Sequence, residues 1–291
     1  MYRTILKKNK SILNIPTLKN NTVIITGGAT GLGKVMAKHF AENDVNTIIC
    51  SRNLKRLQNT TTEINKMTNK DNVICFDVDV SDNKSVEKLY QNIEYENLKP
   101  NILINNAAGN FISQTENLSS NAINRVIDIV LKGTVNMTLP FSKNIMNQNN
   151  IGSVINISTL YAETGSGFVV PSAISKSGIN TLTKSLAAEW GKYGLRYNSV
   201  APGSIYTKGA FSRLDPTGEF IKSLTHKNPS GRLGSPEELA NLILFLSSDF
   251  SYWLNGQIIN FDGGEGIYRA GQFNELNNLG DEYWDKIKKD K

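Results

Sequence analysis

Short runs of consecutive apolar residues alternate along the chain with amphipathic stretches. Continuous apolar runs of this length are typical of strands that are buried on both faces. The predicted strands are 22–26, 46–51, 73–78, 101–104, 153–157, 195–200 and 257–261. The predicted helices are about 34–43, 54–67, 82–93, 121–146, 171–190 and 236–248. Because strands alternate with helices, we expect an α/β fold: a single doubly wound Rossmann-like domain with a mostly parallel, seven-stranded sheet.

The chain shows no internal repeat and no interdomain linker, so we assign residues 21–291 to one catalytic domain. Residues 205–235 lose the periodicity and mix Gly, Pro and polar residues with scattered large apolar ones. Irregular segments of this length inside a domain are often lids or substrate-binding loops. The tail after residue 264 is polar, and Phe273, Tyr283 and Trp284 are the residues expected to anchor it.

Residues 1–20 form a basic N-terminal segment with interspersed Ile and Leu. The segment contains Arg3, Lys7, Lys8, Lys10 and Lys19 and no acidic residue. This pattern is typical of a mitochondrial transit segment and predicts a mitochondrial protein. The alternative is a solvated arm that leads into the first strand of a cytoplasmic protein. No apolar run has the length of a membrane span.

The composition narrows the class of ligand. The formal net charge is +6 and the pI is about 9.1, without a Lys/Arg run or an aromatic-interleaved basic stripe. This favours anionic small molecules over nucleic acid. Cys50 and Cys75 each lie in a predicted strand, so we expect buried thiols and no metal site.

A glycine-rich turn follows the first predicted strand and opens the first predicted helix. The turn reads Gly27-Gly-Ala-Thr-Gly31-Leu-Gly33. A strand, such a turn and a helix together form the arrangement that binds a pyrophosphate on helix N–H groups. The alternative is a turn with a structural role only.

The end of the second predicted strand indicates which nicotinamide cofactor would bind. A site for NAD(H) usually has a carboxylate there, whereas this chain has Arg52, and no acid follows before Glu63. A guanidinium can bind a 2′-phosphate, so we predict NADPH. The alternative is a solvated loop arginine. Asp79 ends the third strand, where it can accept a hydrogen bond from an adenine amino group.

Residues 156–178 contain the candidate catalytic groups. Tyr161 follows the fifth predicted strand, and Ser172 and Lys176 lie four residues apart on one face of the next helix. A phenol, a hydroxyl and an ammonium can therefore meet where strand and helix adjoin, which suits proton transfer. The alternative is that Tyr161 is a loop aromatic and Lys176 a solvated charge.

Four separated motifs resemble the short-chain dehydrogenase/reductase family, in the order of that family. They are Thr26-Gly-x-x-x-Gly31-x-Gly33, Asn105-Asn-Ala-x-Gly109, Pro202-Gly203 and Asp262-Gly-Gly264. The catalytic pattern of the family is Tyr-x-x-x-Lys, with a Ser upstream and an Asn on the preceding long helix. Here Ser172 stands at the Tyr position, Thr159 at the Ser position and Val130 at the Asn position. A phenol would therefore have to come from elsewhere, and Tyr161 is the candidate.

Longer runs at 105–113, 161–173, 185–194 and 208–218 resemble the mitochondrial 2,4-dienoyl-CoA reductases, in which the phenol is displaced in the same way. This resemblance implies an acyl-CoA substrate, NADPH and a homotetramer. It implies catalytic roles for Tyr161, Lys176, Asn110 and Ser172. It implies NADPH contacts from Gly27, Gly28, Ala29, Thr30, Gly31, Leu32, Arg52, Asp79, Lys176, Pro202, Gly203, Ser204 and Ile205. It implies acyl-CoA contacts from Phe111, Ser119 and Arg213.

One position departs from those reductases: Ser81 replaces an arginine that contributes to substrate binding. Two other interpretations also fit the motifs. One is a family member specific for a ketone or an alcohol. The other is a catalytically silent nucleotide sensor or scaffold, for which the missing usual Tyr would be the signature.

Overall fold

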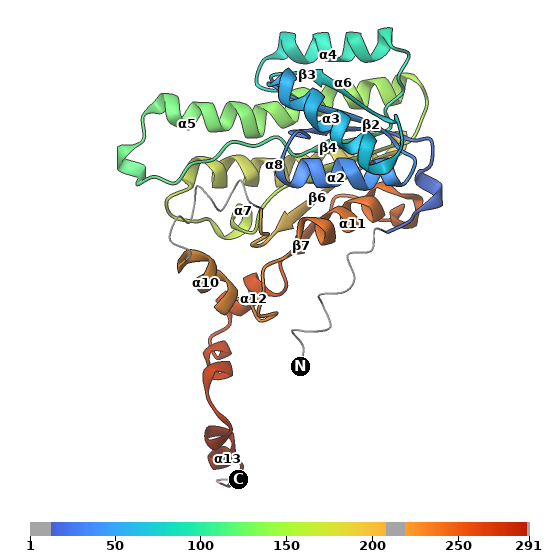
Figure 1. The fold of residues 1–291 in the computed structure, drawn as a ribbon. Coiled ribbons are helices and arrows are strands. Elements are labelled where there is room, and N and C mark those ends of the chain that lie inside the picture. Colours follow the sequence, from blue (N-terminus) through green and yellow to red (C-terminus); the bar gives the residue numbers. More distant parts are fainter. Residues whose placement is uncertain (1–12, 208–218, 290–291) are drawn as a thin grey trace.

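A computed structural model describes residues 13–207 and 219–289. It contains one sheet of seven strands in the order β3-β2-β1-β4-β5-β6-β7 (Figure 1). The strands are β1 Thr22–Thr26, β2 Asn46–Ser51, β3 Val73–Asp77, β4 Ile102–Asn105, β5 Gly152–Ile157, β6 Leu195–Pro202 and β7 Ile258–Phe261. Every strand pair is parallel, so all the carboxyl ends meet at one edge of the sheet. This confirms the predicted doubly wound sheet.

Helices connect each strand to the next. The connecting helices are α2 Gly31–Glu42, α3 Leu54–Thr68, α4 Asn83–Tyr95, α5 Ser120–Ile127, α6 Gly133–Asn147, α7 Tyr161–Thr164, α8 Val170–Trp190, α10 Glu219–His226 and α11 Pro236–Ser247. Two more helices, α12 Glu265–Ala270 and α13 Asp281–Lys289, follow the last strand. Short 3-10 helices lie at Pro16–Leu18, Thr115–Asn117, Gly191–Tyr193, Asp249–Ser251 and Asn274–Asn278.

The sheet is covered on both faces, which gives two separate apolar cores. On one face α2, α3 and α11 contribute Phe40, Leu57 and Ile243 to the first core. On the other face α4 and α6 contribute Leu89 and Phe141 to the second. Because strand side chains point alternately to the two faces, apolar residues at successive positions supply both cores.

The chain just before β1 is part of the first core. Ile15 and Leu18 are buried in it, although the sequence analysis places them in the N-terminal segment. Asn43, at the end of α2, accepts a hydrogen bond from the Ile15 N–H at 2.7 Å. The described part of the N-terminal segment therefore packs on the domain.

Two stretches differ from the sequence prediction. The helix expected at 121–146 consists of α5, a π-helical turn at Asp128–Lys132, and α6. The segment expected to be irregular at 205–235 contains α10. Amphipathic periodicity over eight residues is a weak signal next to Gly and Pro, which explains why α10 was not predicted.

The C-terminal tail does not pack as predicted. In Figure 1 it runs from α12 away from the sheet and ends in α13. Phe273, Tyr283 and Trp284 are all exposed, so they are not anchors on the described part of this chain. The rings of Tyr283 and Trp284 contact each other edge to face, with centroids 5.3 Å apart. Among the described residues, no helix combines the length and apolarity that crossing a bilayer requires.

Candidate functional site

The glycine-rich turn lies between β1 and α2, at the carboxyl edge of the sheet. Gly31 has a φ of +54°, and a Cβ added there would meet no atom within 4 Å. A Cβ on Gly33 would lie 2.4 Å from the Gly27 carbonyl oxygen. Gly33 therefore permits the close contact of helix and turn, while the backbone at Gly31 leaves open space for a ligand.

Asn105 and Asn106 tie this turn to the neighbouring strands. Thr26 Oγ1 accepts the N–H groups of Asn106 and Ala107, each at 2.9 Å. Asn106 Nδ2 donates to the Thr26 carbonyl at 2.9 Å, and Asn105 Nδ2 donates to Asn156 Oδ1 at 2.8 Å. The side-chain amides of Asn105 and Asn106 thus stabilise the strand ends.

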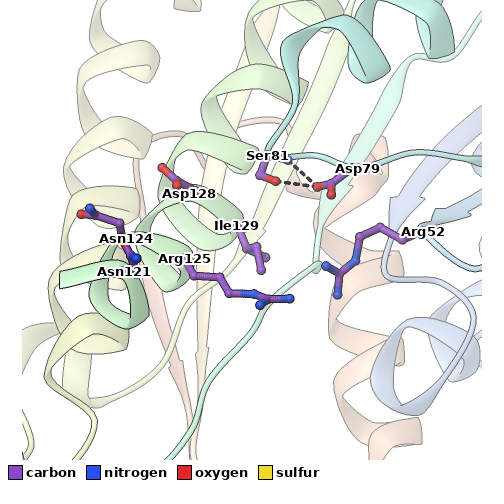
Figure 2. Close-up of a pocket in the computed structure, with 8 residues that line it drawn as sticks. All are labelled: Arg52, Asp79, Ser81, Asn121, Asn124, Arg125, Asp128 and Ile129. Atoms are coloured by element: carbon purple, nitrogen blue, oxygen red, sulfur yellow. Dashed lines mark hydrogen bonds between the residues drawn. The ribbon is translucent and has the colours of Figure 1, made fainter. Parts of the chain in front are cut away.

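A pocket of about 500 Å³ lies beside this turn, between the ends of β2 and β3 and the helix α5 (Figure 2). Arg52 and Asp79 line it together, as the sequence analysis requires of the adenosine end of a cofactor site. Asp79 Oδ1 accepts hydrogen bonds from the Ser81 N–H at 3.0 Å and from Ser81 Oγ at 2.6 Å. Glu63 does not oppose Arg52, because it pairs with Lys34 at 2.5 Å.

Of the four candidate catalytic side chains, the structure brings two into contact and places a third one helical turn away. Tyr161 begins α7, and its hydroxyl lies 3.1 Å from the Ser172 hydroxyl at the start of α8. Lys176 is one turn further along α8, and its ammonium donates to the Ile157 carbonyl at the end of β5. Ser172 and Lys176 are both buried. The Tyr161 hydroxyl therefore contacts the side chain that stands at the usual tyrosine position of the family.

The environment of Lys176 alters its protonation. Burial removes water from the ammonium and lowers the pKa of Lys176 from 10.5 to about 8. Its one hydrogen-bond acceptor among the described residues is the Ile157 carbonyl. The site therefore contains a cation that loses its proton just above neutral pH.

The loop after β4 carries Asn110 and Phe111 and lies against the loop after α7. The Ser113 N–H donates to the Phe168 carbonyl at 3.0 Å, which connects the two loops. Asn110 Oδ1 accepts the Phe111 N–H at 2.9 Å, so the group that Asn110 can donate is its NH₂. Ser119 caps α5 by accepting the Ala122 N–H at 3.2 Å. Arg213 lies outside the described residues.

The segment Pro202–Ile205 leaves the end of β6 and is held by the chain after β7. The Ser204 N–H donates to Glu265 Oε2 at 3.0 Å, and Ile205 forms a bridge with Gly234. Glu265 is buried and pairs with Arg269 at 2.8 Å. Glu265 thus fixes a predicted cofactor-binding segment from a distant part of the sequence.

Val130 occupies the position of the usual family Asn and lies in the π-helical turn. It is fully buried in a small cluster with Val126 and Ile179. Its carbonyl accepts the Thr134 hydroxyl at 2.7 Å. π-Helical turns inside α-helices often occur at functional sites. Here the turn keeps its distorted backbone while an apolar side chain replaces the amide.

Sequence reasoning missed several residues of the site. Arg125, Asn121 and Asn124 on α5 line the pocket opposite Arg52, and Glu265 holds Ser204. No local motif marks any of them, because each acts across elements that only the sheet order brings together. Groups of three or more His, Cys, Asp or Glu side chains that could hold a metal ion are absent from the described residues.

The chain is similar to known reductases and oxidoreductases. Residues 27–265 match the family model described as enoyl-(acyl carrier protein) reductase. An uncharacterised oxidoreductase of Caenorhabditis elegans is 48% identical over 86% of this chain and 80% of its own. A probable 2,4-dienoyl-CoA reductase of the same worm, named as producing (3E)-enoyl-CoA, is 44% identical over 91% of this chain and 86% of its own.

Solved structures agree with the fold. A short-chain dehydrogenase from Bacillus anthracis is 36% identical, covers 87% of this chain and 98% of its own, and has a TM-score of 0.77. A gluconate 5-dehydrogenase from Burkholderia cenocepacia, solved with NADP and tartrate, is 25% identical. It covers 86% of this chain and 96% of its own, with a TM-score of 0.80. The region matched by the family model begins directly after β1 and includes the other six strands, β2 to β7.

Proposed function

Because the chain belongs to the short-chain dehydrogenase/reductase family, we propose that it is an NADPH-dependent 2,4-dienoyl-CoA reductase that produces 3-enoyl-CoA. Such a step assists the β-oxidation of unsaturated fatty acids. The observation that carries the proposal is the 3.1 Å contact between the hydroxyls of Tyr161 and Ser172. A serine at the usual tyrosine position, with a phenol that reaches it from α7, suits a substrate other than a simple alcohol.

The reduction of a conjugated thioester needs a donor at the thioester oxygen. NADPH would supply a hydride for C5 when bound, and the thioester carbonyl oxygen would then carry the negative charge of a dienolate. Tyr161 and the NH₂ group of Asn110 donate hydrogen bonds to it, each contributing about 3–4 kcal/mol as in other oxyanion holes. A proton taken up from the solvent at C2 would neutralise the dienolate and give the 3-enoyl product.

Ser172 and Lys176 have supporting roles in this scheme. Ser172 positions the phenol through their shared hydrogen bond. Lys176 is anchored at the Ile157 carbonyl and holds the ribose of the cofactor with its remaining N–H groups. Phe111 packs on the acyl chain, while Ser119 and Arg213 bind the CoA portion.

The family binds a nicotinamide cofactor, and the residues of this chain fit one. Gly27, Gly28, Ala29, Thr30, Gly31 and Leu32 form the turn that binds the pyrophosphate. The open space at Gly31 supports this assignment. Arg52 binds the 2′-phosphate, and Asp79 accepts from the adenine amino group. Pro202, Gly203, Ser204 and Ile205 line the nicotinamide.

We further propose that residues 21–291 form one catalytic domain that works as a homotetramer. Ile267, Phe273, Leu279, Trp284 and Ile287 are exposed on the C-terminal tail, which suits contacts with another copy. We propose a mitochondrial location through residues 1–20. Because Ile15 and Leu18 are buried, a leader that is removed would have to end before Ile15.

The deciding experiment is an absorbance assay at 340 nm with 2,4-hexadienoyl-CoA. We expect oxidation of NADPH, with much slower oxidation of NADH, and a 3-enoyl product. A 3-ketoacyl thioester serves as the competing substrate. Faster reduction of the ketone would identify a ketone-specific family member, and oxidation of neither cofactor by either substrate would identify a silent nucleotide-binding protein.

A further inference from the structure

The pocket beside Arg52 contains a second arginine that the cofactor does not require. Arg125 lies on α5, on the wall opposite Arg52. Figure 2 shows the two side chains reaching toward each other across the pocket. Two cations that face each other repel unless an anion lies between them. This arrangement therefore favours a strongly anionic ligand.

The carboxylates of the pocket do not neutralise these arginines. Asp79 Oδ1 accepts from the backbone and the hydroxyl of Ser81. Asp128 pairs with Lys132 at 2.6 Å, one turn further along the chain. Within residues 13–207 and 219–289, neither Arg52 nor Arg125 forms an ion pair. Both guanidinium groups are thus available to a ligand.

The wall that contains Ser81 provides no cation. The Ser81 hydroxyl is directed to Asp79 at 2.6 Å, so this position cannot bind a phosphate as an arginine would. Arg125 supplies the missing charge from the facing helix. The amide side chains of Asn121 and Asn124, on the same helix and lining the same pocket, add hydrogen-bond donors.

We propose that Arg125, with Asn121 and Asn124, binds the phosphates of the 3′-phosphoadenosine end of CoA, while Arg52 binds the 2′-phosphate of the cofactor. The two arginines lie in different parts of the fold. Arg52 directly follows β2, whereas Arg125 lies on α5, whose N-cap is Ser119, a proposed acyl-CoA contact. The assignment rests on the proposed acyl-CoA substrate. The ligand chemistry is a nucleotide phosphate in either case, so the experiment must separate CoA from cofactor.

The first measurement is binding of adenosine 3′,5′-bisphosphate and of NADP to the full-length protein by calorimetry. We expect Arg125→Gln to raise the Kd of the bisphosphate about tenfold, as for loss of a charge-assisted hydrogen bond. The Kd of NADP should change by less than about twofold. Lys88→Gln removes an exposed charge from α4, outside the pocket, and should change neither. Circular dichroism checks that each variant is folded.

The second measurement compares 2,4-hexadienoyl-CoA with the same acyl group on pantetheine, which lacks the phosphoadenosine. Arg125→Gln should raise KM for the CoA thioester about tenfold and leave KM for the pantetheine thioester unchanged. Equal increases for both thioesters, no increase for either, or weaker NADP binding would overturn the proposal. A wild-type protein that binds the bisphosphate through Arg125 yet reduces no dienoyl thioester would refute only the proposed reaction.

Discussion

The two ends of the candidate site, the Tyr161–Lys176 group and the Arg52 pocket, differ in burial, and this difference indicates which residues affect the rate and which affect ligand affinity. At the catalytic end, Ser172 and Lys176 are 2% and 6% exposed, and Tyr161 is fixed by a hydrogen bond. At the other end, Arg52 and Arg125 are exposed in an open pocket. Buried groups act strongly on developing charge, whereas exposed charges are screened by salt. Changes at the first end should therefore alter kcat, and changes at the second should alter KM.

The largest effect should come from the phenol. Tyr161→Phe removes the donor to the thioester oxygen and should lower kcat about 10²- to 10³-fold, with little change in KM for NADPH. Tyr193→Phe, which alters an exposed tyrosine of the short helix after α8, is the matched control and should retain full activity. A Tyr161→Phe variant that works at nearly the wild-type rate would refute the catalytic assignment.

The second effect is on the pH dependence at the catalytic end. Because the pKa of Lys176 is lowered to about 8, kcat/KM should fall about tenfold per pH unit above 8 as the ammonium loses its proton. The contribution of Lys176 to the free energy of unfolding changes with pH in the opposite direction to kcat/KM. The unfolded lysine binds more protons between pH 8 and 10.5, so this group makes folding more favourable as pH rises there.

Measurement of kcat/KM and of thermal unfolding over the same pH range distinguishes the effect of Lys176 on activity from its effect on stability. An activity loss that coincides with a lower unfolding temperature would indicate alkaline unfolding and would contradict the role of Lys176. An unchanged rate up to pH 10 would show that the neutral amine suffices.

The sequence predicts the sheet well and the site in part, for physical reasons. Strands buried on both faces are rich in apolar residues at successive positions, as at Ile24, Ile48 and Leu103, so they stand out without any alignment. The residues at strand ends are predictable because parallel strands all end at one edge. Tyr161, Ser172 and Lys176 could be grouped because one short segment contains all three.

The remaining features depend on contacts that no local pattern reveals. Arg125 faces Arg52 only because α5 lies across the ends of β2 and β3. Glu265 reaches Ser204 across 61 residues of sequence. The π-helical turn at Asp128–Lys132 is a single wider turn inside a long helical stretch, and so short a change of period is a weak signal in the sequence. Such residues become predictable only once the sheet order is known.

The exposed end gives the third prediction. Arg52→Gln should raise KM for NADPH about tenfold and leave KM for NADH unchanged, because only NADPH has the 2′-phosphate. High salt should raise the KM of the wild type for NADPH toward that of the Arg52→Gln variant, because salt screens the attraction between the exposed Arg52 and the 2′-phosphate. Initial rates with each cofactor at low and high salt measure this. An equal loss with NADH would mean that Arg52 supports the fold of the turn.

The smallest effect should come from Ser172. Ser172→Ala removes a neutral hydrogen bond that positions the phenol, so kcat should fall about two- to tenfold, the equivalent of about 0.5–1.5 kcal/mol. The matched control is Ser175→Ala, on the same helix. Its hydroxyl is buried and donates to the Pro171 carbonyl at 2.8 Å, without contact to Tyr161. Ser175→Ala should lower stability and leave kcat unchanged.

The size of the Ser172 effect tests how the catalytic end is built. A loss as large as that of Tyr161→Phe would mean that the serine hydroxyl itself donates to the thioester oxygen, with the phenol behind it. No loss at all would mean that packing alone fixes the phenol. The intermediate value is expected because Tyr161 is the donor while its ring, held at the start of α7, depends on Ser172 only for the direction of its hydroxyl.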